Sequence, residues 1–274
     1  MRLLNGFHGT NHMHPLLRGA LDLLYPPRCE ACGELRREPI CADCLAAIQR
    51  IAPPLCEVCG EPFDPLAQAA PRCADCRGRR HSFSLARSAA YYTGPLAEAI
   101  KRFKYDCQMV LWRPLGRLMA ESLGNGASAI DPDTVDVICP VPLHLSRLRE
   151  RGFNQSELLG EVIAEEFGKP IKLLLERTRP TLPQVDLPAQ SRAANVRDAF
   201  GPHLREVIAG QRVLLVDDLF TTGATLAECA RVLRRAGAAD VRVLTLARPL
   251  PRWRQVRADA QSRFPPLGVA RQRG

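Results

Sequence analysis

The segment 213–225 places two carboxylates and three hydroxyls within a few residues of one another. An apolar run is followed by two aspartates, and then by threonines and a glycine at the start of a predicted helix. The first amides of a helix have no partner within it and lie at the positive end of its dipole, so a phosphate can bind there without a lysine. Glycine lets the backbone approach a ligand closely, and carboxylates suit sugar hydroxyls or Mg²⁺. The sequence therefore predicts a site for a phosphorylated ribose, formed by Asp217, Asp218, Thr221, Thr222, Gly223, Ala224 and Thr225.

Each half of this segment also has an ordinary interpretation. Acidic residues at a strand end are often only solvated, and threonines before a helix are often only N-caps. Their combination in this order favours a binding site over both. The chain contains no G-x-x-x-x-G-K-[ST] motif and no G-x-G-x-x-G motif that opens a helix, which argues against a P-loop ATPase and a dinucleotide site.

Eight of the 11 cysteines form four C-x-x-C pairs, all before residue 77. Two such pairs offer four thiolates to one Zn²⁺ ion in a tetrahedron, with no position open for a substrate. We therefore expect two structural zinc sites. Pairing of neighbours is favoured because each loop then closes locally, but the spacing also permits an interleaved pairing. The neighbouring arrangement gives Cys29, Cys32, Cys41 and Cys44 in one site, and Cys56, Cys59, Cys73 and Cys76 in the other.

Several other polar or reactive residues have competing interpretations. Arg147 and Arg151 lie one helical turn apart and are suited to bind a polyanion together, although a solvated helix face has the same pattern. Lys101 and Lys104 are interpreted as solvated, and His144 as structural. The three cysteines outside the pairs are interpreted as small buried apolar residues, namely Cys107, Cys139 and Cys229.

The pattern around these residues predicts strands alternating with helices. Such alternation indicates an α/β fold, in which a mostly parallel sheet is flanked by helices. Ligands bind at the carboxyl edge of such sheets, where the two aspartates are expected. Strands are predicted at 89–93, 135–141, 171–175, 212–216 and 241–246, and helices from Gly94, at 110–123, around 158–167 and at 224–237.

Composition and length indicate how the chain is divided. The chain has 274 residues, of which 46% are apolar, enough for one ordinary domain and a small one. We predict a disordered stretch at 1–15 and a cysteine-rich double zinc ribbon at 16–80. A short helix at 15–24 is expected at the start of the ribbon, before the first cysteine pair. A domain at 87–248 and a basic disordered tail at 249–274 follow. The tail supplies +5 of the net charge of +9, and eight thiolates that hold two zinc ions lower the total by four, so the charge is weak evidence that the core binds nucleic acid.

The location of the protein follows from what the chain lacks. No apolar run approaches the roughly 18 residues that span a bilayer, so we expect no membrane-spanning segment. The first 25 residues do not resemble a signal peptide. Paired cysteines without secretion indicate metal binding in a reducing compartment, so we predict a cytoplasmic protein.

The segment 213–225 resembles the phosphoribosyl-pyrophosphate (PRPP) binding motif of type I phosphoribosyltransferases. The resemblance implies that Asp217 and Asp218 contact the ribose 2′ and 3′ hydroxyls. It also implies that residues 221–225 surround the 5′-phosphate, and that Mg²⁺ accompanies PRPP.

A second resemblance covers residues 16–248 and concerns the ComF family, which pairs zinc ribbons with a phosphoribosyltransferase-like domain. It rests on Asp136-Val-Ile-Cys-Pro-Val-Pro-Leu-His144, followed by Arg147 and Arg151-Gly-Phe-Asn-Gln155. Leu24-Tyr-Pro-Pro-Arg-Cys29, Lys101-Arg-Phe-Lys-Tyr105, Gln184, Arg192 and Asn195 agree with it. Members of this family are linked to DNA uptake during natural transformation.

These resemblances imply two functions of different classes. As an enzyme, the protein transfers a phosphoribosyl group from PRPP and releases pyrophosphate. As a non-catalytic protein of the competence machinery, it holds PRPP or a nucleotide while the ribbons and tail contact single-stranded DNA or uptake proteins. A purely structural zinc protein leaves the acid and threonine segment unexplained.

Overall fold

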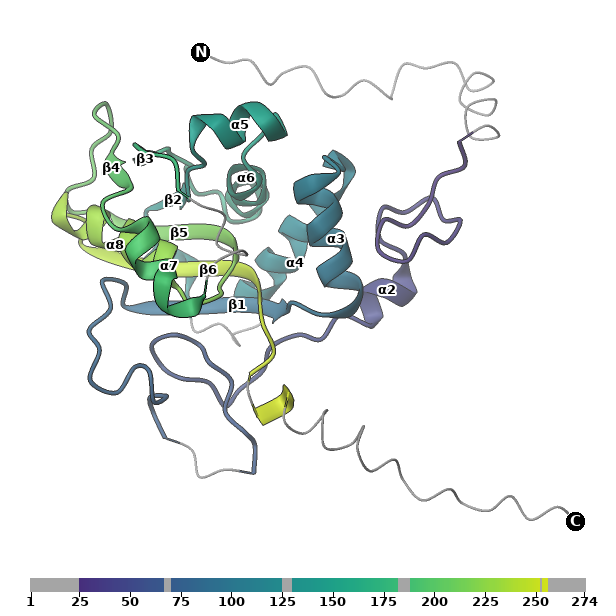
Figure 1. Cartoon of the computed structure of the whole chain (residues 1–274), viewed down its shortest axis with the longest axis horizontal. Coiled ribbons are helices and arrows are strands. Elements are labelled where there is room, and N and C mark those ends of the chain that lie inside the picture. The colour runs from purple at the N-terminus through teal and green to yellow at the C-terminus, as the bar shows by residue number, and fades with distance from the viewer. Residues whose placement is uncertain (1–24, 67–69, 125–129, 182–187, 252, 256–274) are drawn as a thin grey trace, which may run out of the picture.

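A parallel sheet forms the centre of the computed structural model, which describes residues 25–66, 70–124, 130–181, 188–251 and 253–255 (Figure 1). Its four strands in the described part of the chain are ordered β1-β6-β5-β2, and every neighbouring pair is parallel. The predicted fold class is therefore confirmed. The strands are β1 (Leu85–Tyr91), β2 (Val137–Pro140), β5 (Arg212–Leu219) and β6 (Asp240–Arg248).

The strands match the predicted segments except at their ends. β5 continues past Val216 to Leu219, so both aspartates belong to the strand itself. β1 begins four residues before the predicted segment, because Leu85 and Ala86 also pair with β6. The apolar run of β5 is continuous because residues 213–216 are buried on both faces, as expected for a parallel strand covered by helices.

Helices cover both faces of the sheet (Figure 1). On one face, α3, α4 and α6 pack against Leu214 and Val216 of β5. On the other face, α8 packs against Val213 and Leu215. The helices are α2 (Ala42–Ala46), α3 (Gly94–Tyr105), α4 (Trp112–Gly124), α5 (Leu145–Arg151), α6 (Gln155–Phe167), α7 (Ala189–Val196) and α8 (Ala224–Arg235), with short 3-10 turns η1 (Met109–Leu111) and η2 (Pro132–Thr134).

Both edges of the sheet are covered by other backbone. Residues 49–51 run antiparallel to β1, with Ile51 N–H donating to Ala89 O and Tyr91 N–H donating to Gln49 O, at 3.1 and 2.9 Å. At the other edge, Ile171 forms an isolated bridge to Ile138. Among the described residues, these pairings occupy part of each edge of this sheet and so hinder its extension by another chain.

The strand predicted at 171–175 differs from the structure. Only an isolated bridge forms at Ile171, and the regular strand β3 (Leu175–Arg177) begins where the prediction ends. β3 pairs antiparallel with β4 (Phe200–Pro202), which the sequence did not indicate. Strands of three residues are too short to show an alternating pattern.

The cysteine-rich segment lies at the β1 edge and reaches both faces of the sheet. Cysteines 29, 41 and 44 are buried with the residues of the α3, α4 and α6 face. The four cysteines from Cys56 to Cys76 are buried with those of the α8 face. The segment between the two groups is the one that pairs with β1. The cysteine-rich segment therefore contacts both faces of the sheet at its β1 edge.

The tail was predicted to be disordered from residue 249, but its first residues are ordered in the structure. Residues 253–255 form a helical turn against the cysteine-rich segment. The indole of Trp253 donates to Pro62 O at 3.1 Å, and the Arg254 guanidinium lies 4.7 Å from the ring centre of Tyr91. The predictions for 1–15, for a helix at 15–24 and for 256–274 fall on residues outside the described part. No helix within the described residues has the length and apolarity needed to cross a bilayer.

Candidate functional site

The end of β5 and the start of α8 form a tight loop. Gly223 is the N-cap of α8, and its φ of 73° lies in the left-handed region that favours glycine. A Cβ atom at this position would lie 2.7 Å from the ring of Phe220, so the backbone rests directly on that ring. We call residues 221–225 the phosphate loop. Backbone amides at the start of a helix are suited to an anion.

The two aspartates differ in their partners. Asp217 Oδ1 accepts from the Ser156 hydroxyl at 2.8 Å and from the Asp218 backbone N–H at 2.9 Å. Burial raises the pKa of Asp217, while the charge of Lys104 opposes this rise. Asp218 is 4% exposed and its carboxylate is ion-paired with Lys104. The two carboxylates are thus held in fixed but different orientations.

The prediction that Lys104 is solvated is wrong. Its side chain is only 14% exposed and lies within the site against Asp218. Burial lowers the pKa of Lys104 to about 8, although the charge of Asp217 acts in the opposite direction. The sequence carried a signal for this placement, because Lys104 follows the buried Ile100 by four residues and so shares its helix face. Lys101 is exposed, as predicted, and pairs with Glu98 at 3.8 Å.

The two arginines on α5 lie at the same pocket as the aspartates. Arg147 is bound to Glu150 at 2.7 Å, and Arg151 donates to Gln155 and lies 5.7 Å from the ring centre of Tyr105. Burial lowers the pKa of Arg151. Each guanidinium is thereby oriented by a neighbour while still lining the pocket.

Capping residues hold α5 and α6 in place beside β2. His144 has the structural role predicted for it, since it is the N-cap of α5 and its Nδ1 accepts from Ser146 N–H at 3.2 Å. Asn154 is the N-cap of α6, and its side-chain amide donates to Val141 O at 3.1 Å. This bond ties the turn after β2 to the helix that presents Ser156 to Asp217.

Thr222 is exposed and does not line the pocket of about 440 Å³ at this edge, whereas the other predicted site residues do line it, namely Arg147, Arg151, Asp217, Asp218, Thr221, Gly223, Ala224 and Thr225. Sequence reasoning missed Ser156 and Arg177, which lie far from the motif along the chain and are brought to it by α6 and β3. Gln184 falls outside the described residues, and Arg192 lines the pocket from α7. Five basic side chains and two acidic ones line it, which suits a polyanion: Lys104, Arg147, Arg151, Arg177, Arg192, Asp217 and Asp218.

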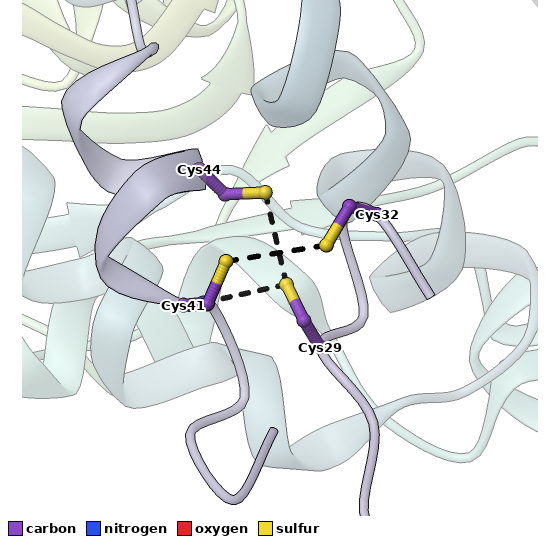
Figure 2. A group of neighbouring side chains, drawn as sticks. All are labelled: Cys29, Cys32, Cys41 and Cys44. Atoms are coloured by element: carbon purple, nitrogen blue, oxygen red, sulfur yellow. Dashed lines mark hydrogen bonds between the residues drawn. The ribbon is translucent and has the colours of Figure 1, made fainter. Parts of the chain in front are cut away.

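The cysteines form two groups of four, and the neighbouring pairing is confirmed. Within each group all sulfurs lie within 4.8 Å of one another. We call Cys29, Cys32, Cys41 and Cys44 the first cluster, which Figure 2 shows with its sulfurs converging. We call Cys56, Cys59, Cys73 and Cys76 the second cluster.

Sulfur separations in both clusters fit a zinc ion. Four sulfurs placed about 2.3 Å from Zn²⁺ at tetrahedral angles are about 3.8 Å apart. The observed Sγ–Sγ distances are 3.8 Å for Cys29–Cys44, 3.9 Å for Cys32–Cys41 and 3.6 Å for Cys59–Cys73. Four thiolates complete the coordination, so the clusters suit structural zinc with no open position.

The three cysteines outside the two clusters differ in burial. Cys139 and Cys229 are fully buried, as predicted. Cys107 is exposed, which corrects the prediction, and its φ of 52° is uncommon for a side chain with a Cβ. It lies in the turn after α3, where no core is available to cover it.

Two family models match separate parts of the chain. A double zinc ribbon domain matches residues 20–77, and a phosphoribosyl transferase domain matches residues 154–266. Competence protein F of Haemophilus influenzae is 31% identical over 234 residues, which cover 84% of this chain and 94% of that protein. The chain belongs to the ComF family.

Other ComF relatives carry related names. The DNA utilization protein YhgH of Salmonella typhimurium is 33% identical over 77% of this chain and 91% of its own length. Competence protein ComFC of Bacillus subtilis is 30% identical over 77% of this chain and 85% of its own. The zinc ribbon and the phosphoribosyltransferase domain are thus joined in one chain here, as the ComF resemblance implied.

Proposed function

We propose that this ComF protein binds PRPP or a related ribose phosphate, together with Mg²⁺, in the pocket at the carboxyl edge of the sheet. One observation carries the proposal: the paired aspartates, the phosphate loop apart from Thr222, and the two arginines Arg147 and Arg151 line a single pocket. Its volume of about 440 Å³ lies in the range typical of small-molecule sites.

Each group has a role in this proposal. The amides and hydroxyls of the phosphate loop bind the 5′-phosphate, where the dipole of α8 adds attraction. Asp217 and Asp218 accept hydrogen bonds from the ribose hydroxyls. Arg147 and Arg151 bind the pyrophosphate, because paired guanidinium groups suit phosphate oxygens.

The donor set also accommodates Mg²⁺. Carboxylate oxygens are magnesium ligands, and a ligand phosphate usually completes the coordination. Each carboxylate already has a partner, Asp217 through its Oδ1 and Asp218 through Lys104, so the remaining oxygens of both would be the protein ligands. A bound Mg²⁺ screens the charge of the pyrophosphate.

We propose further that the site transfers the phosphoribosyl group. The bond between ribose C1 and the pyrophosphate oxygen breaks, and its electron pair leaves with pyrophosphate. An acceptor nucleophile then bonds to C1 and loses its proton to solvent or a base. The protein contributes mainly by positioning the reactants and stabilising charge, with Arg147 and Arg151 at the leaving group.

The names of the relatives support a role in DNA uptake or use. We propose that single-stranded DNA or proteins of the uptake machinery are partners, contacted through the ribbons and the basic tail. Binding of single-stranded DNA that weakens steeply with salt, and weakens further when residues 256–274 are removed, supports this role. Salt-insensitive binding that survives removal of these residues contradicts it.

Pyrophosphate release from PRPP separates an enzyme from a binding protein. The zinc-loaded full chain is incubated with PRPP and Mg²⁺, alone and with a panel of nucleobases and single-stranded DNA. Turnover with one acceptor establishes the transferase. Tight PRPP binding without release in any arm favours the non-catalytic alternative. Absence of binding by PRPP, by related ribose phosphates and by nucleotides contradicts both.

A further inference from the structure

The ring of Phe220 forms the floor of the phosphate loop. Phe220 directly follows β5, is 5% exposed, and its backbone N–H donates to Ala247 O of β6 at 2.9 Å. Three of its ring atoms lie within 2.7 to 3.3 Å of the place where a Cβ of Gly223 would stand. A movement of this ring therefore moves or releases the turn that begins α8.

A first chain of contacts joins Phe220 to the second cluster through aromatic rings. Phe83 meets Phe220 edge to face, with ring centres 6.4 Å apart at 80°. His81 stacks on Phe83 at 4.8 Å, and its Nε2 lies 3.4 Å from Sγ of Cys76. Only two side chains thus separate a zinc-binding sulfur from the floor of the loop.

A second chain of contacts runs through a buried arginine at the end of β6. Arg248 is 5% exposed, and its guanidinium lies 5.2 Å from the ring centre of Phe220. The same guanidinium donates to Cys59 O at 3.0 Å and is ion-paired with Glu61. Both chains end on Phe220, and both begin at the turns that carry the second cluster.

The geometry of the second cluster depends on its metal. Four thiolates at mutual contact distance repel one another unless a cation binds them, so the turns of Cys56, Cys59 and Cys76 have one arrangement with the ion and relax without it. Packed aromatic contacts transmit such a shift because close-packed interiors do not deform smoothly. The first cluster packs on the opposite face of the sheet, away from Phe220.

We propose that the second cluster and the phosphate loop are coupled sites, with His81, Phe83, Arg248 and Phe220 as the positioning residues between them. The inference rests on the proposed ribose-phosphate site. Zinc in the second cluster holds the loop in its binding form. Coupling of two sites is reciprocal, so a bound phosphorylated ribose in turn strengthens zinc binding in the second cluster and not in the first.

Zinc release to a chromogenic chelator tests this coupling with the full chain. Release is followed with and without saturating PRPP and Mg²⁺, and calorimetry on the same sample first establishes whether PRPP binds. The exposed Cys32 identifies the first cluster, because C32S accelerates only its release phase. We expect PRPP to slow the other phase by about fivefold or more and to leave the Cys32 phase unchanged.

Variants separate positioning from general destabilisation. Phe220→Leu removes the ring on which both contact chains converge, so PRPP at saturation no longer slows release from the second cluster. Phe83→Leu interrupts one chain only and reduces the protection without abolishing it, which serves if Phe220→Leu does not fold. Phe167→Leu, the same substitution on the opposite face of the sheet, keeps full protection.

The outcomes distinguish the two proposals. PRPP that binds by calorimetry but leaves both release phases unchanged overturns the coupling and leaves the ribose-phosphate site standing. The coupling is also overturned if saturating PRPP slows zinc release in Phe220→Leu and in Phe83→Leu as much as it does in the wild type. A chain that does not bind PRPP contradicts the proposed site, and the coupling fails with it.

Discussion

Lys104 is a cation buried beside two carboxylates, and its charge is sensitive to pH near neutrality. Burial lowers its pKa to about 8 from an ordinary value of 10.5. In the folded protein the ammonium group therefore loses its proton well before an exposed lysine does. The pocket has one positive charge fewer above pH 8 than below it.

We expect the affinity for PRPP to fall by about fivefold or more between pH 7 and pH 9, because a polyanion binds more weakly to the less positive pocket. The ligand's phosphates stay ionised over this range, since their second pKa lies near 6. Calorimetry across this range measures the effect. Lys104→Gln flattens the profile, and a variant with the same slope as the wild type assigns the slope to another group.

Gly223 tests the loop backbone directly. Gly223→Ala introduces a Cβ at a φ of 73° and 2.7 Å from the Phe220 ring. The free energy of unfolding is expected to fall by about 1–3 kcal/mol, and PRPP affinity to fall by at least about tenfold because the loop leaves its cradle geometry. Urea unfolding and calorimetry measure the two effects. Gly168→Ala, at a φ of 61° with open space around it, is the matched control for backbone strain alone.

At the level of single residues, local sequence signals were good guides. The order of acids, threonines and glycine predicted the loop at the carboxyl end of a strand, since these residues are contiguous. Ser156 was missed because its bond to Asp217 spans 61 residues and no short pattern records it. Lys104 was predicted to be solvated because lysine is usually exposed, although its spacing of four residues from Ile100 indicated the buried face of the helix.

Between elements, the crossing of α4 and α6 depends on one glycine. A Cβ at Gly116 would lie 2.6 Å from Cβ of Val162, which is 4% exposed. The two helices therefore approach more closely there than a side chain at residue 116 permits. This crossing supports α6, which carries Ser156 and Asn154 to the site.

Gly116→Ala separates helix propensity from packing. Alanine favours a helix by about 1 kcal/mol over glycine, whereas overpacking the crossing costs about 1–3 kcal/mol. We expect net destabilisation in urea unfolding. Combining it with Val162→Ala removes the two Cγ atoms that crowd the new methyl at 2.7 and 3.1 Å but keeps the Cβ at 2.6 Å. The double variant is therefore relieved in part and is more stable than the sum of the single effects predicts. Strictly additive effects contradict a close crossing.

Strands were predicted well where they are long and buried, and poorly where they are short. Continuous apolar runs marked β2, β5 and β6, because strands covered on both faces lack polar alternation. The small sheet of β3 and β4 has strands of three residues, whose pairing is decided by tertiary contacts with α8.

At the scale of the whole molecule, the two clusters pack on opposite faces of the sheet at its β1 edge. Full loading is expected to give two zinc ions per chain, measured by elemental analysis. Removing them with a chelator frees the segment that covers β1, and we expect the melting temperature to fall by more than about 10 °C. Far fewer than two ions per loaded chain contradicts the two-cluster account, as does an unchanged melting temperature after complete removal.

The sequence predicted the two clusters and their neighbouring pairing, because local loop closure decides both. Their placement on opposite faces of the sheet was not predictable, since it follows from long-range pairing of residues 49–51 with β1. The order along the tail from Trp253 was missed for a related reason. Trp253 contacts Pro62, which is 191 residues away along the chain.

Binding of PRPP to the wild type and to the double variant D217N/D218N tests the central claim most directly. Asparagine keeps the shape of each side chain, removes its charge and replaces one acceptor oxygen with an amide donor. Titration calorimetry with Mg²⁺ is expected to show binding by the wild type and a loss of at least about 100-fold in the variant, because both sugar contacts are weakened. Asp136→Asn, a carboxylate outside the pocket, keeps wild-type affinity. A folded double variant that binds PRPP as tightly as the wild type contradicts the account.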